Sequence, residues 1–185
     1  YDGTAQVSAS GAMTLLSTVT ASNSATVDVE TTFSSTYTTY LLVGTGIKIP
    51  GGGGGGINLI CRFKVGGVYD AGANYYYHSS KLSVGAATYD AINSAAATSI
   101  AITGTNTTAA AESSINFSLF IHDPSSTTLS KKVYWQGSYT DGVDVPRKTA
   151  GMGGNTAITA LTGIRIMGDS GNITGVFRLY SIANS

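Results

Sequence analysis

The chain has 185 residues, which is enough for one domain with a hydrophobic core and tight for two. Ten basic and ten acidic residues give a formal net charge of zero at only 11% charged residues. This balance excludes disorder driven by charge excess, and it excludes the clustered basic surface that nucleic-acid binding requires. The 24 glycines, the many Ser and Thr residues and the three prolines suit short strands joined by small-residue turns.

The first twenty residues are small and polar, with Met13, Leu15 and Leu16 as an apolar cluster. We interpret residues 1–20 as an N-terminal arm or a linker remnant, and residues 21–185 as one β-sandwich domain. The chain begins at Tyr1 and shows no basic segment followed by an apolar run, so a signal peptide is not indicated. A start at Tyr1 instead indicates a removed segment or a longer parent chain. The longest apolar stretches fall far short of the roughly 20 residues of a membrane helix, so no membrane insertion is expected.

Apolar and polar residues alternate with the period of a β-strand along almost the whole chain. The clearest predicted strands are residues 57–65 and 115–121; less regular ones are residues 40–49, 75–84 and 132–139. The alternation breaks at Ile60. The residues expected to face the core are, in chain order, Val27, Val29, Ile57, Leu59, Cys61, Phe63, Val65, Ile100, Ile102, Ile115, Phe117, Leu119, Ile121, Ile164, Ile166, Phe177 and Leu179.

Segments rich in Gly, Asp, Ser and Asn predict turns between these strands, beginning at Gly44, Gly66, Asp123, Asp141, Gly151 and Ser170. The six glycines at 51–56 predict a mobile hairpin loop, with a flexible tip that moulds to a partner as the alternative. The Ala-rich residues 89–97 predict one or two helical turns. About eight to ten strands without a long amphipathic helix indicate an all-β chain folded as an antiparallel β-sandwich.

No motif in the sequence supports catalysis or a metal site. The GDSG segment at 168–171 resembles the nucleophile region of chymotrypsin-like proteases, but neither His78 nor His122 has the sequence context of that family's base, so we interpret Ser170 as part of a turn. Two histidines without a HExxH pattern do not make a zinc site. The six glycines are not a phosphate loop, because no strand-to-helix unit follows them and no Gly-Lys-Ser or Gly-Lys-Thr sequence ends them. We therefore expect no cofactor, no metal and no enzymatic activity.

Two smaller features have structural interpretations. The single cysteine, Cys61, excludes an intrachain disulfide, and its apolar neighbours predict a buried, unreactive thiol. Asp141 and Asp144 together lack the ligand pattern of a calcium loop, so we expect a solvated turn there.

Aromatic residues beside polar ones are the candidate ligand or interface residues. Exposed aromatic rings next to amides and carboxylates serve both sugar binding and protein interfaces. Burial in the core or in a subunit interface is the alternative for Tyr75, Tyr77 and Trp135. The candidates form two groups along the chain: Tyr75, Tyr76 and Tyr77, and then Trp135, Gln136, Tyr139 and Asp141.

The C-terminal segment LTGIRIMGDSGNITGVFRLYSI, residues 161–182, resembles the C-terminal β-sandwich domain of tailed-bacteriophage virion proteins of the tail-fibre, receptor-binding or head-fibre type. In that family a small-residue SGNI turn precedes a last strand of the form FRLYGI. The matching residues here are Ser170, Gly171, Asn172 and Ile173, followed by Phe177, Arg178, Leu179 and Tyr180. Three further segments, residues 25–49, 59–77 and 115–139, are similar to other strands and turns of the family. Ser181 and the six-glycine loop depart from its pattern.

The resemblance implies a jelly-roll-like sandwich, commonly assembled as a homotrimer, that is built into a virion together with other virion proteins. Three hypotheses follow. The first is a fibre or receptor-binding domain that contacts the host surface, with a host-surface glycan as its ligand. The second is a capsid decoration or head-fibre protein with a purely structural role. The third is an enzyme such as a glycan depolymerase, which needs a pair of carboxylates that no pattern here indicates.

Overall fold

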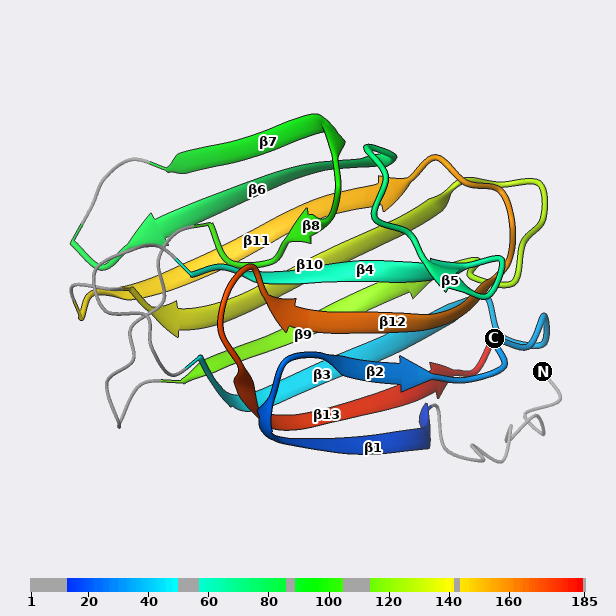
Figure 1. Cartoon of the computed structure of the whole chain (residues 1–185), viewed down its shortest axis with the longest axis horizontal. Helices are drawn as coiled ribbons and strands as arrows, with labels where there is room; N and C mark the ends of the chain where they lie inside the picture. Colours follow the sequence, from blue (N-terminus) through cyan, green and yellow to red (C-terminus); the bar gives the residue numbers. More distant parts are fainter. Residues whose placement is uncertain (1–12, 50–56, 86–88, 105–113, 142–143, 185) are drawn as a thin grey trace, which may run out of the picture.

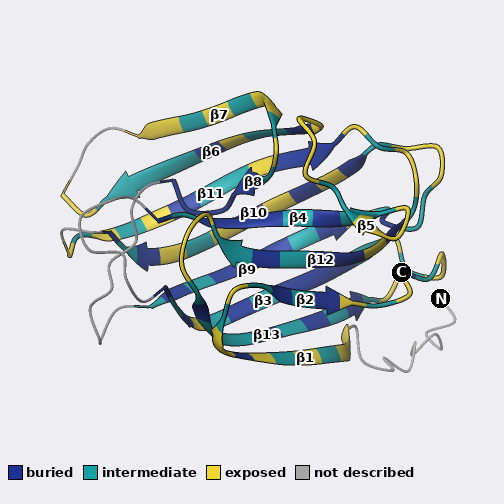
Figure 2. Cartoon of the chain, in the orientation of Figure 1, coloured by how far each residue is buried: buried dark blue, intermediate teal, exposed yellow. Residues whose placement is uncertain are grey.

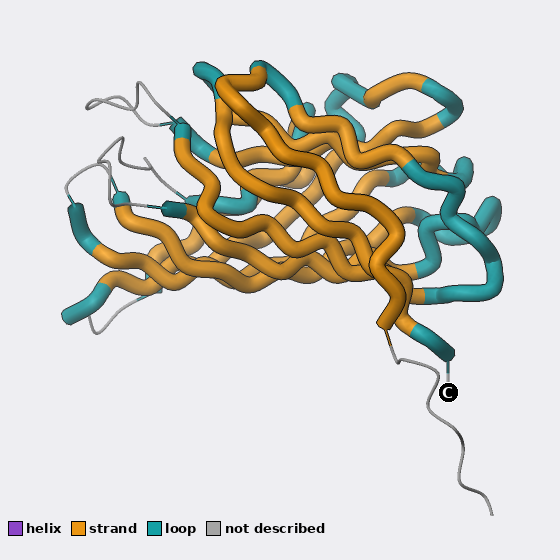
Figure 3. Tube along the Cα trace, turned by 90° about the horizontal axis from the view of Figure 1, so that it is seen from below, coloured by secondary structure: helices purple, strands orange, loops and turns teal. Residues whose placement is uncertain are grey.

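The computed structural model describes residues 13–49, 57–85, 89–104, 114–141 and 144–184. These residues form thirteen strands and no helix. The strands make two antiparallel sheets that lie face to face (Figure 1 and Figure 3). The prediction of an all-β antiparallel sandwich is confirmed, whereas the expected eight to ten strands were too few.

The larger sheet has eight strands and forms the rear layer in Figure 1. Its central part includes the meander β9–β10–β11, which the chain builds without leaving the sheet. Its strands, from one edge to the other, are β1 (Met13–Ser24), β13 (Ile173–Ile182), β3 (Thr39–Lys48), β9 (Ile115–His122), β10 (Lys131–Thr140), β11 (Pro146–Asn155), β6 (Tyr75–Ser83) and β7 (Asp90–Ala97).

The smaller sheet lies in front of the larger one in Figure 1, and the chain crosses between the two sheets several times. The chain alternates between the sheets from β1 to β4 and again from β11 to β13. Such crossings bring segments from both ends of the sequence into one core. The strands of this sheet are β2 (Val27–Glu30), β12 (Leu161–Gly168), β4 (Leu59–Val65) and β5 (Val68–Tyr69), with β8 (Ile100–Ala101) paired to β4.

One hydrophobic core fills the space between the two sheets, where the dark blue positions of Figure 2 gather. The alternation read from the sequence places its residues correctly: β9 alternates strictly, with its four apolar odd-numbered residues buried, from Ile115 to Ile121. Every residue predicted to face the core is buried except Val65, which is partly buried and packs against the core. Ile60, the break in the pattern, is also buried, although it points to the other face of β4.

Two of the six predicted turns were wrong, because both lie within strands. The segment from Gly44 is a bulge in β3, where the register with β9 shifts between Gly44 and Ile47 and Gly46 has a φ of 60°. The segment from Gly151 lies in β11, where the glycines leave room for aromatic side chains of neighbouring strands. The turns at Gly66, Asp123, Asp141 and Ser170 are confirmed.

Two other segments also differ from expectation. The Ala-rich residues 89–97 form the edge strand β7, paired with β6, and the prediction of helical turns was wrong, because backbone pairing with β6 outweighs the helix propensity of alanine. Residues 13–20, placed in the N-terminal arm by the sequence, belong to β1, which pairs with β13. The six glycines at 51–56 and residues 1–12 lie outside the described residues.

Candidate functional site

Tyr75 and Trp135, two of the candidate ligand residues, lie in the core and are fully buried. The Tyr75 hydroxyl donates to the carbonyl of Asp70 at 3.1 Å and accepts from the amide of Phe63 at 2.8 Å. Burial raises the pKa of Tyr75. Trp135 Nε1 donates to the carbonyl of Ile102 at 3.0 Å. Both rings therefore stabilise the fold by joining the two layers, as the core alternative stated.

Tyr139 and Asp141 are also buried, so the expectation of a solvated turn was wrong at Asp141. The Asp141 carboxylate accepts hydrogen bonds from Arg147 Nε at 2.7 Å and from the Val145 amide at 2.9 Å. Arg147 Nη2 donates a second, charge-assisted hydrogen bond to the same carboxylate oxygen, Oδ2. The Asp141 carboxylate therefore links the end of β10 to the start of β11 through these hydrogen bonds.

Two candidate residues face solvent on the outer side of the eight-stranded sheet. Gln136 on β10 is exposed, and Tyr76 on β6 is half-buried, with its hydroxyl over Gly154. The two do not share a hollow, because the groove that Gln136 lines does not include Tyr76. Tyr77 points the other way and packs against the core, where burial raises its pKa.

The outer face of the eight-stranded sheet carries an apolar row that crosses six strands in register. Tyr134 and Met152 are 45% and 53% exposed, and Leu15 at the edge strand is 52% exposed. The rings of Phe120 and Tyr134 lie 6.4 Å apart. From edge to centre, the apolar row is Leu15, Tyr180, Leu41, Phe120, Tyr134 and Met152.

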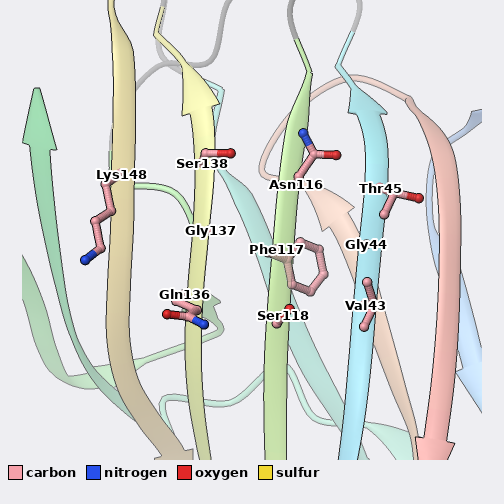
Figure 4. A pocket seen from close by; sticks show the side chains of 10 residues that line it. All are labelled: Val43, Gly44, Thr45, Asn116, Phe117, Ser118, Gln136, Gly137, Ser138 and Lys148. Carbon is pink, nitrogen blue, oxygen red and sulfur yellow. The ribbon is translucent and has the colours of Figure 1, made fainter. Parts of the chain in front are cut away.

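A polar groove of about 340 Å³, whose lining side chains are drawn in Figure 4, lies on the same face. It runs beside the apolar row, because Val43, Ser118 and Gln136 are each two residues along their strands from Leu41, Phe120 and Tyr134. It crosses β3, β9, β10 and β11. Asn116, in its wall, is held by the amide of Gly46 at 2.9 Å and by Ser114 at 3.1 Å. We use the term polar groove for the outward side chains of Val43, Thr45, Asn116, Ser118, Gln136, Ser138 and Lys148.

The outer face of the smaller sheet differs, because its charges pair with one another. Asp28 accepts two hydrogen bonds from Arg165, at 2.7 and 2.8 Å, and Arg165 stacks on the Tyr69 ring at 4.0 Å. Lys64 donates to Glu30 at 2.7 Å, and this bond is the main reason why the pKa of Glu30 is lowered. Four charged groups of this face are therefore paired with one another, and Arg62, opposite Arg165 in register, donates to the Thr98 carbonyl at 3.0 Å.

The motifs considered for catalysis have structural roles in the described chain. Asp169 of the GDSG segment accepts from the Asn58 amide and side chain, both at 3.0 Å, and ties the β12–β13 turn to the start of β4. Ser170 is exposed in this turn. No group of three His, Cys, Asp or Glu residues able to hold a metal occurs among the described residues. Burial raises the pKa of the Cys61 thiol to about 12, so the expected unreactive thiol is supported.

Sequence reasoning identified Gln136 in the polar groove but missed Lys148, Ser118, Ser138 and the apolar row. These residues alternate with core residues along their strands, so each could have been placed on an outer face. Which outer faces adjoin depends on the pairing of strands distant in sequence, such as β3 with β9.

Within the described residues no helix is long and apolar enough to cross a membrane. Comparisons with protein-family models, curated proteins and solved structures found no match.

Proposed function

We propose that this chain is a structural protein of a tailed-bacteriophage virion, a fibre or receptor-binding domain that contacts the host surface. The observation that carries the proposal is the outer face of the eight-stranded sheet, with its apolar row beside an open polar groove. The resemblance of residues 161–182 to virion proteins supplies the biological setting. A binding role without catalysis accords with the structural hydrogen bonds of Asp169 and Asp141.

The apolar row supports contact with another molecule. Apolar side chains scattered singly over a surface are ordinary, but a contiguous row beside polar groups marks interaction sites. The smaller sheet offers no such surface, because its outer face consists largely of paired charges. We therefore place the contact on the larger sheet.

A capsid decoration or head-fibre role is the second candidate, and one feature favours it. The apolar row reaches the edge strand β1, which pairs with β13 alone among the described residues, and Met13, Leu15 and Leu16 are all exposed there. A neighbouring subunit or another virion protein that covered this edge would bury both the side chains and the unpaired backbone of β1. A homotrimer assembled in this way is part of the same proposal.

The test is the location of the chain in particles purified from cells that express it. Mass spectrometry of the particles should detect the chain, and its absence from them would overturn the proposal. Cryo-EM of the same particles separates the two candidates: density at the tail periphery supports receptor binding, and density on the capsid lattice supports decoration.

A further inference from the structure

The polar groove extends toward a cationic side chain at each end. Lys148 lines it on β11, and Arg178 on β13 lies opposite Val43 in register, with its guanidinium 3.5 Å from the Thr45 hydroxyl. Four strand spacings separate β13 from β11, which at roughly 4.8 Å per strand is about 19 Å. A short oligomer can therefore contact both cations at once.

The eight-stranded sheet has almost no negative charge on its strands. The described residues of these eight strands include one carboxylate, that of Asp90 on the edge strand β7, and it pairs with Lys81 at 3.4 Å. Lys132, Lys148 and Arg178 form no ion pair with any described residue. A face with unpaired cations and no opposing carboxylates attracts an anionic partner.

The groups between the two cations suit hydroxyl-rich ligands. The side chains of Ser118, Gln136 and Ser138 make no hydrogen bond to any described residue, and all three line the groove. Amides and hydroxyls can each donate and accept, as sugar hydroxyls do. Asn116 is oriented in advance by its bonds to Gly46 and Ser114, which reduces the entropy lost on binding.

Aromatic side chains lie one step along the strands from these polar groups. Tyr134 is two residues from Gln136 on the same face of β10, and Phe120 is two residues from Ser118 on β9. An exposed tyrosine ring offers an apolar surface with a polar rim. The C–H face of a sugar ring can stack there while its hydroxyls reach the groove.

From these features we propose that the polar groove binds a carboxylate-bearing oligosaccharide. Lys148 and Arg178 pair with sugar carboxylates, Gln136 and the serines bind hydroxyls, and Tyr134 stacks on a ring. The proposal deepens the receptor-binding function above and rests on it. Nucleic acid fits less well, because each strand of a duplex carries one phosphate for about every 3.4 Å of helix axis, whereas the cations here stand at the two ends of the groove.

The experiment measures binding of the purified chain to defined oligosaccharides by calorimetry. The acidic probes are tetragalacturonate, a hyaluronan tetrasaccharide and α2,8-linked trisialic acid; maltotetraose and cellotetraose are the neutral controls, and oligo(dT) tests nucleic acid. At least one acidic probe should bind, neutral probes should bind much more weakly, and added salt should weaken the acidic interaction. Failure of all three acidic probes, equal binding of neutral ones, or tighter binding of oligo(dT) would overturn the proposal.

Variants locate the binding on this face. Lys148→Ala should weaken binding of the acidic probe by about tenfold, since a charge-assisted hydrogen bond is lost, and Gln136→Ala should weaken it less. Lys148→Arg should retain most of the affinity. Lys64→Ala, the same charge change on the opposite sheet, is the matched control and should bind as the unmodified chain does. Equal losses in Lys148→Ala and Lys64→Ala, at unchanged melting temperatures, would place the ligand elsewhere.

The two proposals can fail separately. A chain that is found in particles but binds no acidic oligosaccharide keeps the virion role and loses the ligand assignment. A chain that binds the acidic probes through Lys148 but is absent from particles keeps the ligand assignment and loses the virion role.

Discussion

The indole ring of Trp135 lies over the backbone of Gly151, its register partner on β11. A Cβ atom at position 151 would overlap the ring and would also lie 2.6 Å from the carbonyl oxygen of His78. The largest fully buried side chain of the protein thus occupies the space that a side chain at residue 151 would need. This is why a glycine-rich segment that resembles a turn in the sequence is the middle of a strand.

Gly151→Ala should therefore destabilise the fold by about 1–3 kcal/mol, the usual cost of overpacking a core. Gly104→Ala is the control, because a Cβ at position 104 has ordinary contacts, with Lys81 at 3.4 Å. Urea denaturation followed by Trp fluorescence measures both. A free energy of unfolding unchanged by Gly151→Ala would mean that Trp135 does not cover this strand.

Phe117 and Phe120 on β9 test the division between the two faces of the larger sheet. Phe117 is buried in the core, so Phe117→Ala should cost about 3–5 kcal/mol through lost burial and a cavity. Phe120 faces outward in the apolar row, and Phe120→Ala should cost about 1 kcal/mol. Chemical denaturation of both variants checks the difference. Equal costs would contradict the assignment of faces.

The ion pairs of Asp141 and Asp28 differ in burial, so removing each pair should lower the free energy of unfolding by a different amount. Asp141→Ala leaves the Arg147 guanidinium without its buried carboxylate and should destabilise the fold by about 3 kcal/mol. Asp28→Ala breaks a bidentate pair with Arg165 that is about one-third exposed, and should cost about 1 kcal/mol or less. Thermal denaturation at low and high salt compares them. A larger loss for Asp28→Ala would contradict this ranking.

Asp70 should contribute a pH-dependent part of the stability. Burial by itself would raise the pKa of its carboxyl, but the hydrogen bonds from Asn155, Gly72 and Asn74 outweigh burial and lower it. A carboxyl with a lowered folded-state pKa stabilises the fold above its unfolded value, near 3.8, and loses that contribution as pH falls through the folded value.

Asp70→Asn should therefore reduce the free energy of unfolding at pH 7 and pH 5, with the difference from the unmodified chain narrowing below about pH 4. Urea denaturation at each pH measures the difference. Asp90→Asn, which removes an exposed carboxylate at the sheet edge, is the control. A difference that stays constant from pH 7 to pH 3 would show that the Asp70 carboxylate does not supply this pH dependence.

The candidate residues show which side-chain orientations the sequence pattern can predict and which it cannot. Three consecutive tyrosines require at least one to leave the core, and Tyr76 does so while Tyr75 and Tyr77 face inward. Trp135 and Gln136 are adjacent in sequence but face opposite sides of β10, so the cluster they form in the sequence does not exist in space. Chemical type alone could not separate the core aromatic from the surface amide.

Local patterns in the sequence are enough to predict the all-β class, the core-facing residues of the strands and four of the turns, because alternation and turn chemistry are local properties. Which outer faces adjoin follows from the three-dimensional arrangement of the strands. The pairing of β3 with β9 and of β13 with β3 aligns side chains that are far apart in the chain into the apolar row and the polar groove. Register between distant strands depends on packing against the whole core, and no local pattern encodes it.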